Sequence, residues 1–115
     1  MTNSIMHADF MAGGWRNCSF EAFHPGVEIC WLHQEVDGSA AALLRYAKGA
    51  SVPRHSHPGI ETIVVLEGAQ TDDTGHYQEG ALVINPIGTT HSVRSDEGCV
   101  ILIIWSKPVQ FIDAK

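Results

Sequence analysis

The chain has 115 residues, which is enough for one folded domain and too short for two domains of ordinary size. Hydrophobic residues make up 44% and charged residues 17%, a composition typical of a globular protein rather than a disordered or fibrous one. Seven Lys and Arg against thirteen Asp and Glu give a formal net charge of -6. The basic surface that binds nucleic acid or an anionic membrane is therefore missing, and we expect neither as a partner.

The first 20 residues contain isolated aromatic side chains without a regular period, Phe10, Trp15 and Phe20. We expect this segment to be an arm that packs its aromatic residues onto the rest of the protein or onto a partner. Residues 1–7 lack a basic segment followed by an apolar one, so no secretory signal is expected.

Glycine and proline turn signals divide the following sequence into short segments. Several of these segments are rich in β-branched and aromatic residues, which favours strands over helices. The alanine-rich segment 40–47 has helical propensity, but its position between two turn glycines favours a strand. In the segment 100–105, the residues on both faces of the strand are apolar, which predicts that this strand is buried on both sides. The predicted strands are 27–33, 40–47, 60–66, 81–84, 91–94, 100–105 and an edge strand at 109–112, before a frayed end.

The three cysteines, Cys18, Cys30 and Cys99, show no C-x-x-C spacing. An odd number of cysteines without this spacing is typical of reduced thiols that pack as small apolar residues. The longest apolar stretch, residues 100–105, is far shorter than the roughly 20 residues of a membrane-spanning helix. These observations predict a cytoplasmic location.

Two histidines separated by one residue, His55 and His57, point to the same side if they lie on a strand. Glu61 follows in an apolar surrounding, where a carboxylate needs a partner. His91 opens an apolar strand directly after a proline-glycine turn and is either a further ligand or a hydrogen-bonded core residue. Imidazole binds Zn, Cu, Fe and Ni, and carboxylate adds a hard oxygen, so the pattern indicates a divalent-metal site.

These residues resemble the two sequence motifs of the cupin superfamily. The first motif is matched at every position by Gly49-x5-His55-x-His57-x3-Glu61-x6-Gly68. The second is matched by Gly80-x5-Pro86-x-Gly88-x2-His91, and Ser95 stands where the family usually has Asn. The resemblance implies an all-β fold, the double-stranded β-helix of RmlC-like jelly-roll barrels. It also implies that the metal ligands are His55, His57, Glu61 and His91.

Longer segments are similar to the cupin domain of ChrR-type anti-sigma factors and their stand-alone relatives. The likeness covers about residues 25–105 and is carried by residues 44–47, 52–59, 66–68, 75–77 and 98–99. Such anti-sigma factors have a separate N-terminal zinc-binding domain, which this chain lacks, so we expect anti-sigma activity not to carry over. We expect one cupin domain over residues 1–115, with an arm at 1–20 and a β-barrel at 21–112.

The resemblance implies two alternative functions. In the first, the chain is a dioxygenase-type metalloenzyme whose metal binds an oxygen-chelating substrate. In the second, it is a non-catalytic sensory or ligand-binding module that acts through a partner protein. In both, Fe, Zn, Mn or Ni keeps positions open for a small-molecule ligand or substrate. No separate catalytic residue is identified. Exposed edge strands in small barrels are commonly covered by a second subunit, so we expect a homodimer.

Other side chains leave alternatives open. Arg45 or Tyr46 either points inward and supports the site, or both lie on an exposed strand face. Aromatic residues Trp31, Trp105 and Phe111 are interpreted as core or dimer-interface residues rather than as a substrate cage. The remaining histidines are expected on the surface or in loops: His7, His24, His33 and His76.

Overall fold

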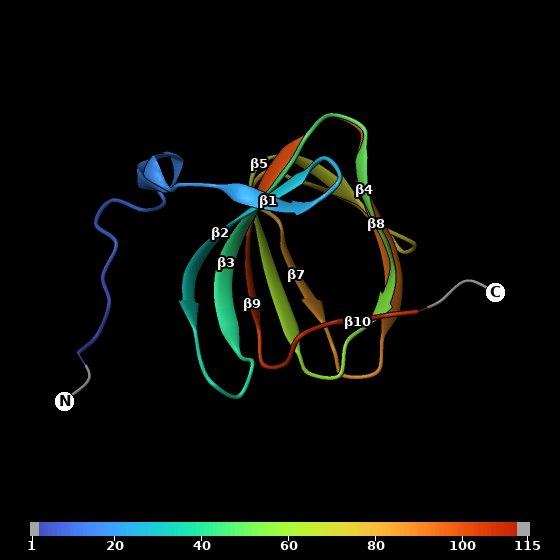
Figure 1. Cartoon of the computed structure of the whole chain (residues 1–115). Helices are drawn as coiled ribbons and strands as arrows, with labels where there is room; N and C mark the ends of the chain where they lie inside the picture. Colours follow the sequence, from blue (N-terminus) through green and yellow to red (C-terminus); the bar gives the residue numbers. More distant parts are fainter. Residues whose placement is uncertain (1–2, 113–115) are drawn as a thin grey trace.

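A computed structural model describes residues 3–112, which form ten β-strands and one short 3-10 helix (Figure 1). The frayed end expected after residue 112 and the first two residues of the expected arm lie outside the described residues. Within the described part of the chain, no helix is long and apolar enough to cross a membrane. In chain order the elements are η1 (Gly14–Asn17), β1 (Glu21–His24), β2 (Val27–Gln34), β3 (Ala40–Tyr46), β4 (Ala50–Ser56), β5 (Glu61–Thr71), β6 (His76–Gln78), β7 (Leu82–Asn85), β8 (Thr90–Ser95), β9 (Cys99–Trp105) and β10 (Gln110–Phe111).

The strands form one curled antiparallel sheet that wraps around an interior (Figure 1). The strands follow each other in the order β1-β2-β3-β9-β5-β8-β4-β10, and β6 and β7 also pair with β5. Residues 61–68 of the long strand β5 pair with β9, and residues 61–64 also pair with β7. Its last residues, 69–71, pair with β6, and Thr71 also pairs with β8. Strand β5 thus belongs to both sides of the barrel. The expected double-stranded β-helix is confirmed.

Alternation along the strands sends one set of side chains into the barrel. In β9, Ile101, Ile103 and Trp105 point inward and are buried, as the alternating sequence predicts. They pack with apolar side chains of β2, β3, β5 and β8 into one continuous core. Segment 40–46 forms a strand, although its alanines have helical propensity, because β2 and β9 pair with it on both edges.

The N-terminal segment packs against the outer face of the sheet. It runs beside β2 and β3 outside the barrel (Figure 1). Trp15 in η1 is buried against Leu43, Leu66 and Val100, whose side chains point away from the barrel interior. Strand β9 is therefore buried on both faces along most of its length, as expected, but Ile104 near its end is 48% exposed.

Three strands were not predicted: β1, β4 and β6. Strand β4 carries Pro53, which cannot donate a hydrogen bond to a neighbouring strand and so disfavours a strand assignment. In the structure the register between β4 and β8 shifts between Val52 and His55, so Pro53 lies within an irregular stretch of the pair. The missed strand is the one that carries the first metal-ligand candidate.

Candidate metal centre

Three side chains from separate strands and one from the loop after β4 converge at one end of the barrel interior. His55 lies in β4 directly opposite His91 in β8, His57 follows the end of β4, and Glu61 begins β5. One ligand-type atom of each lies within 4.8 Å of the corresponding atoms of the others, and all four residues are buried. The structure thus brings together every residue that the sequence indicates for a metal site.

In all three histidines, the ring nitrogen Nδ1 lies within hydrogen-bond distance of an acceptor oxygen. Nδ1 of His55 lies 2.8 Å from the Pro53 carbonyl oxygen, and Nδ1 of His57 lies 3.0 Å from the carbonyl oxygen of Thr89. Nδ1 of His91 lies 2.9 Å from a carboxylate oxygen of Asp72. Because these three partners accept hydrogen bonds, each Nδ1 donates, and each neutral ring keeps the Nε2 lone pair free.

The free nitrogen atoms face one another. Nε2 of His91 lies 3.0 Å from Nε2 of His55. Nε2 of His57 is buried and has no hydrogen-bond partner among the described residues, although it lies 3.2 Å from Oε1 of Glu61. A buried nitrogen without a partner is costly, and a cation bound by the lone pairs and the carboxylate removes that cost. The four side chains therefore fit a divalent metal ion.

Glu61 is held by Asn85, whose side-chain amide donates a hydrogen bond of 3.0 Å to Oε1. Burial by itself raises the pKa of Glu61, but the neighbouring His57 and the bond from Asn85 outweigh burial and lower it. Burial likewise lowers the pKa of His57, but the Glu61 carboxylate outweighs it, so this pKa is raised. For His55, burial prevails and lowers the pKa. Glu61 is thus ionised and His55 neutral, as metal ligands require.

Asp72 holds the ring of His91 in place, and no motif in the sequence singles out this residue. Its Oδ2 accepts the bond from His91, while its Oδ1 accepts bonds from the backbone nitrogens of Thr74 and Gly75 and from the Tyr77 hydroxyl. The pattern Asp-x-Thr-Gly is recognisable in the sequence as a turn. Nothing in that local pattern indicates a contact with a histidine on another strand.

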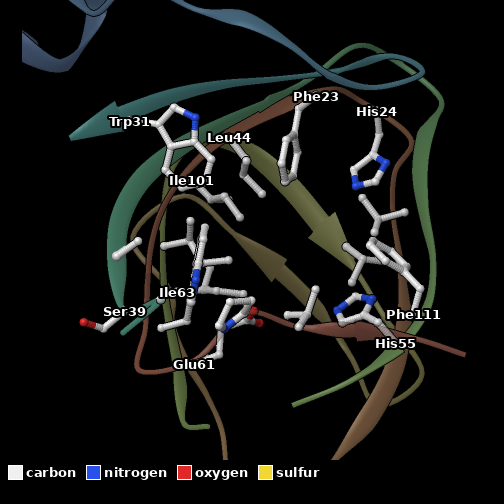
Figure 2. A pocket seen from close by; sticks show the side chains of 18 of the residues that line it. Phe23, His24, Trp31, Ser39, Leu44, His55, Glu61, Ile63, Ile101 and Phe111 are labelled. Carbon is white, nitrogen blue, oxygen red and sulfur yellow. The ribbon is translucent and has the colours of Figure 1, made fainter. Parts of the chain in front are cut away.

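A cavity of about 300 Å³ extends from the metal-ligand candidates through the barrel interior (Figure 2). His55, Glu61 and His91 line it, whereas His57 is buried and is not part of the lining. The inner walls are aliphatic and are formed by Leu44, Val52, Ile63, Val93, Ile101 and Ile103. No Lys or Arg of the described residues lines the cavity. Its interior is therefore apolar except at the metal-ligand end and at a few polar side chains.

Of the two alternatives on β3, Tyr46 points inward and Arg45 outward. Tyr46 is buried and lines the cavity together with Gln70. Burial raises its pKa, so the phenol stays protonated at neutral pH. Arg45 is exposed, forms an ion pair with Glu28 and stacks on the ring of Phe20.

The structure corrects two further interpretations. His24, expected in a loop or on the surface, lies in β1 and lines the cavity. Trp105 lies in the core as expected, but Trp31 and Phe111 line the cavity together with it. Of the cysteines, Cys30 and Cys99 are buried and Cys18 is only half-buried, and all three are free.

Ser95, which stands where the second cupin motif usually has Asn, also forms a hydrogen bond. The side chain of Ser95 is buried, and its hydroxyl donates a 2.5 Å hydrogen bond to the Ala69 carbonyl oxygen. This bond connects the end of β8 to β5 and lies apart from the metal-ligand candidates. The substitution thus leaves the four-residue cluster intact.

The barrel and its buried cluster of three histidines and one glutamate define a protein of the cupin class. The family described as the ChrR Cupin-like domain matches residues 11–109. This match covers most of the chain, so the chain belongs to the ChrR Cupin-like domain family. The family resemblance seen in the sequence is confirmed.

Comparison with the anti-sigma factor ChrR agrees with this assignment. The anti-sigma-E factor ChrR of Cereibacter sphaeroides is 33% identical over 73 residues, which are 62% of this chain and 34% of that protein. The crystal structure of Rhodobacter sphaeroides SigE in complex with the anti-sigma ChrR aligns with a TM-score of 0.74 and 26% identity, covering 86% of this chain and 55% of that one. The chain thus spans only about a third of the length of the curated relative.

More distant solved structures share the fold. An RmlC-like cupin protein from Ralstonia eutropha aligns with a TM-score of 0.76 and 20% identity over 85% of this chain and 69% of that one. An acetylacetone dioxygenase from Acinetobacter johnsonii aligns with a TM-score of 0.78 and 16% identity over 98% of this chain and 79% of that one. At these identities the comparison concerns the barrel alone.

Proposed function

We propose that the chain binds one divalent metal ion through His55, His57, Glu61 and His91 and presents it to a small molecule in the barrel cavity. The convergence of three Nε2 lone pairs on a buried carboxylate carries this proposal. Three nitrogen ligands and one oxygen ligand suit Fe, Zn, Mn or Ni and leave positions open on a six-coordinate ion.

We propose further that the site acts as a dioxygenase-type oxidoreductase on an oxygen-chelating substrate. A redox-active ion such as iron supplies reactivity toward dioxygen and polarises chelating oxygen atoms when it is bound. The chain itself holds the ligands in place through Pro53, Thr89 and Asp72 and excludes water with aliphatic walls. The similarity in fold to an acetylacetone dioxygenase supports this reaction class by analogy.

The second candidate function is a metal-bound sensory or ligand-binding module that acts through a partner protein. The family assignment and the 33% identity to an anti-sigma factor favour it. In this function the ion is redox-inert zinc, and the filled cavity changes the binding of the partner. The two candidates share the metal centre and differ in whether the bound molecule is converted.

Elemental analysis of protein purified without a metal-affinity tag tests the metal centre. We expect about one ion per chain in the wild type and loss of the ion in His91→Ala, because each missing ligand weakens the site. Unchanged metal content in both His55→Ala and His91→Ala would contradict the assignment. Added metal should also raise the melting temperature of the wild type and leave that of His91→Ala unchanged, because an ion that binds only the folded state stabilises it.

Metal identity combined with oxygen uptake separates the two functions. Iron with oxygen uptake that depends on a chelating diketone supports the enzyme. Zinc without oxygen uptake, together with a protein captured by the zinc-loaded chain and lost from His91→Ala, supports the module.

We also propose that residues 1–115 act as one cupin domain, with the arm at 1–20 attached to the barrel at 21–112, and that two copies form a homodimer. Burial of Trp15 against the sheet supports the single domain. Exposed apolar side chains on the outer face of the sheet support the dimer: Leu82, Ile84 and Ile104. The free cysteines of the described chain support a reducing, cytoplasmic location.

A further inference from the structure

Aromatic rings form a continuous series along the lining of the cavity. The series comprises Trp105, Trp31, Phe23, His24 and Phe111, and we call it the aromatic collar. These residues come from β9, β2, β1 and β10, so the collar joins strands that are far apart in the sequence. Figure 2 shows the rings of Phe23, His24 and Trp31 along one margin of the cavity, with His55 and Glu61 at the opposite margin.

Neighbouring rings of the collar contact one another edge to face. Ring centroids lie 5.8 Å apart for Trp31 and Trp105 and 6.2 Å apart for Phe23 and Trp31. The series continues from His24 to Phe111 at 5.1 Å. It ends on a metal-ligand candidate, because the ring of Phe111 lies 5.7 Å from that of His55. The collar therefore reaches the metal centre at Phe111.

Two rings of the collar are only half covered. Phe23 is 41% exposed and Phe111 is 46% exposed, although both line the cavity. Large aromatic rings gain free energy when they are covered by an apolar or aromatic surface. The aliphatic side chains of Leu44, Ile63 and Ile101 also line the cavity, and Figure 2 shows Leu44 and Ile101 beside Trp31. A flat molecule in the cavity would cover the exposed rings and contact these aliphatic side chains.

The polarity and size of the cavity restrict the ligand further. The absence of Lys and Arg from the described lining leaves phosphorylated or multiply carboxylated molecules without a counter-charge. The volume of about 300 Å³ lies at the lower end of the range of ligand pockets, which is roughly 300–1,000 Å³. The cavity therefore suits an uncharged tail no larger than a single ring with short substituents.

We propose that the cavity selects a small conjugated molecule that places two oxygen atoms on the metal ion and an aromatic ring against the collar. Substrates of this class are aryl diketones and related aryl carbonyl compounds. This inference rests on the proposed function, since the oxygen atoms require the bound ion, but the preference for an aromatic ring depends on the collar alone.

Three diketones with the same chelating group test the inference: 1-phenyl-1,3-butanedione, its cyclohexyl analogue and acetylacetone. Binding is measured by titration calorimetry and by tryptophan fluorescence on zinc-loaded protein, because zinc prevents oxidation of the ligand. We expect the phenyl compound to bind about tenfold or more tightly than acetylacetone and more tightly than the cyclohexyl compound. Equal affinity for the three compounds, or for the phenyl and cyclohexyl compounds, would overturn the inference.

Variants of the half-exposed rings test the collar directly. Phe23→Leu combined with Phe111→Leu retains apolar bulk and removes both aromatic rings, so we expect the preference for the phenyl over the cyclohexyl compound to disappear. Val36→Ala serves as the control, because Val36 is fully exposed and lies outside the cavity lining. A preference that survives in the double variant would overturn the role of the collar.

The same titrations separate this inference from the proposed function on which it rests. Zinc that binds without any preference among the diketones overturns the inference and leaves the metal centre standing. Failure of the wild type to bind zinc overturns both.

Discussion

Asp72 shows how one side chain can serve both a turn and a metal ligand. Its two carboxylate oxygens have separate partners, since Oδ1 accepts the bonds of the turn and Oδ2 accepts the bond from His91. In Asp72→Asn the amide oxygen can still accept the bonds of the turn, whereas the amide nitrogen faces His91. A donor at this position favours the tautomer that has its proton on Nε2, which blocks the metal-binding atom.

We therefore expect Asp72→Asn to weaken zinc binding by about 10–100-fold, which is the usual range for outer partners of metal ligands. Competition with a chromophoric chelator measures the affinity. Denaturant unfolding of the metal-free variant serves as the control and should show little change, because the turn is retained. Wild-type affinity in Asp72→Asn would contradict the positioning role.

The pH dependence of metal binding follows from two histidines with opposite shifts. The pKa of His57 is raised, because the Glu61 carboxylate outweighs the effect of burial, so a proton competes with the metal near neutral pH. Burial lowers the pKa of His55, which is therefore already deprotonated. We expect the affinity for zinc to rise with pH through the neutral range, with about one proton released per ion. Calorimetry in buffers of different ionisation enthalpy counts that proton.

The stability of the metal-free protein should change in the opposite direction over the same range. A histidine whose pKa is higher in the folded protein than in the unfolded chain stabilises the folded state at pH values below its pKa in the unfolded chain. This contribution disappears as the pH rises through its pKa in the folded protein. The pKa of Glu61 is lowered, so its contribution is present above the usual glutamate pKa and disappears as pH falls. The pair should therefore stabilise the metal-free protein most between about pH 4.5 and 6.5. If the stability of the wild type did not fall as the pH rises above about 6.5, just as in His57→Ala, the pairing would be contradicted.

At the scale of elements, the close pairing of β5 and β9 depends on a glycine. Gly68 has a positive φ of 74°, and a Cβ atom there would lie 2.1 Å from the carbonyl oxygen of Gly98. Because the clashing atom belongs to the backbone, the two strands would have to separate. Gly49 also has a positive φ, 82°, but no atom lies within 4 Å of the corresponding Cβ position.

These two glycines form a matched pair for mutation. We expect Gly68→Ala to lower the free energy of unfolding by more than about 2 kcal/mol, because conformational strain and a backbone clash add. Gly49→Ala should cost only about 1 kcal/mol, since strain acts alone. Urea unfolding monitored by tryptophan fluorescence measures both. Equal losses in the two variants would show that the close approach of the strands does not limit stability.

At the scale of the whole molecule, the outer face of the sheet carries an uncovered apolar patch, Leu82, Ile84 and Ile104. Thr62 of β5 lies between Ile84 and Ile104 in the pairing of the three strands, so these side chains share the face opposite the cavity. The N-terminal arm covers a neighbouring part of the same face through Trp15. A second copy that covered the patch would complete the burial of this face.

We expect Ile84→Glu combined with Ile104→Glu to convert the dimer into a monomer, because two charges would have to be buried at the interface. Light scattering should give twice the chain mass of 12.5 kDa for the wild type and one chain mass for the variant. Val36→Glu is the control, since this exposed apolar residue lies in a loop away from the patch. A monomeric wild type would refute the dimer.

The sequence by itself determined the all-β fold and the four ligand candidates. Strand alternation and turn glycines act over a few residues, so they can be recognised without a structure. The cupin motifs then add the spacing of His55, His57, Glu61 and His91. The strand around Pro53 escaped prediction because proline weakens the local strand signal, and only pairing with β8 and β10 makes the segment a strand.

Only the tertiary structure decided which side chains support the metal centre and which surround the ligand. Asp72, just after β5, reaches His91 on the paired strand β8, Asn85 reaches Glu61 from β7, and the aromatic collar joins His24 to Phe111. These contacts depend on the register of paired strands and on the curvature of the sheet. Both arise from packing between segments distant in the sequence, which local patterns do not encode.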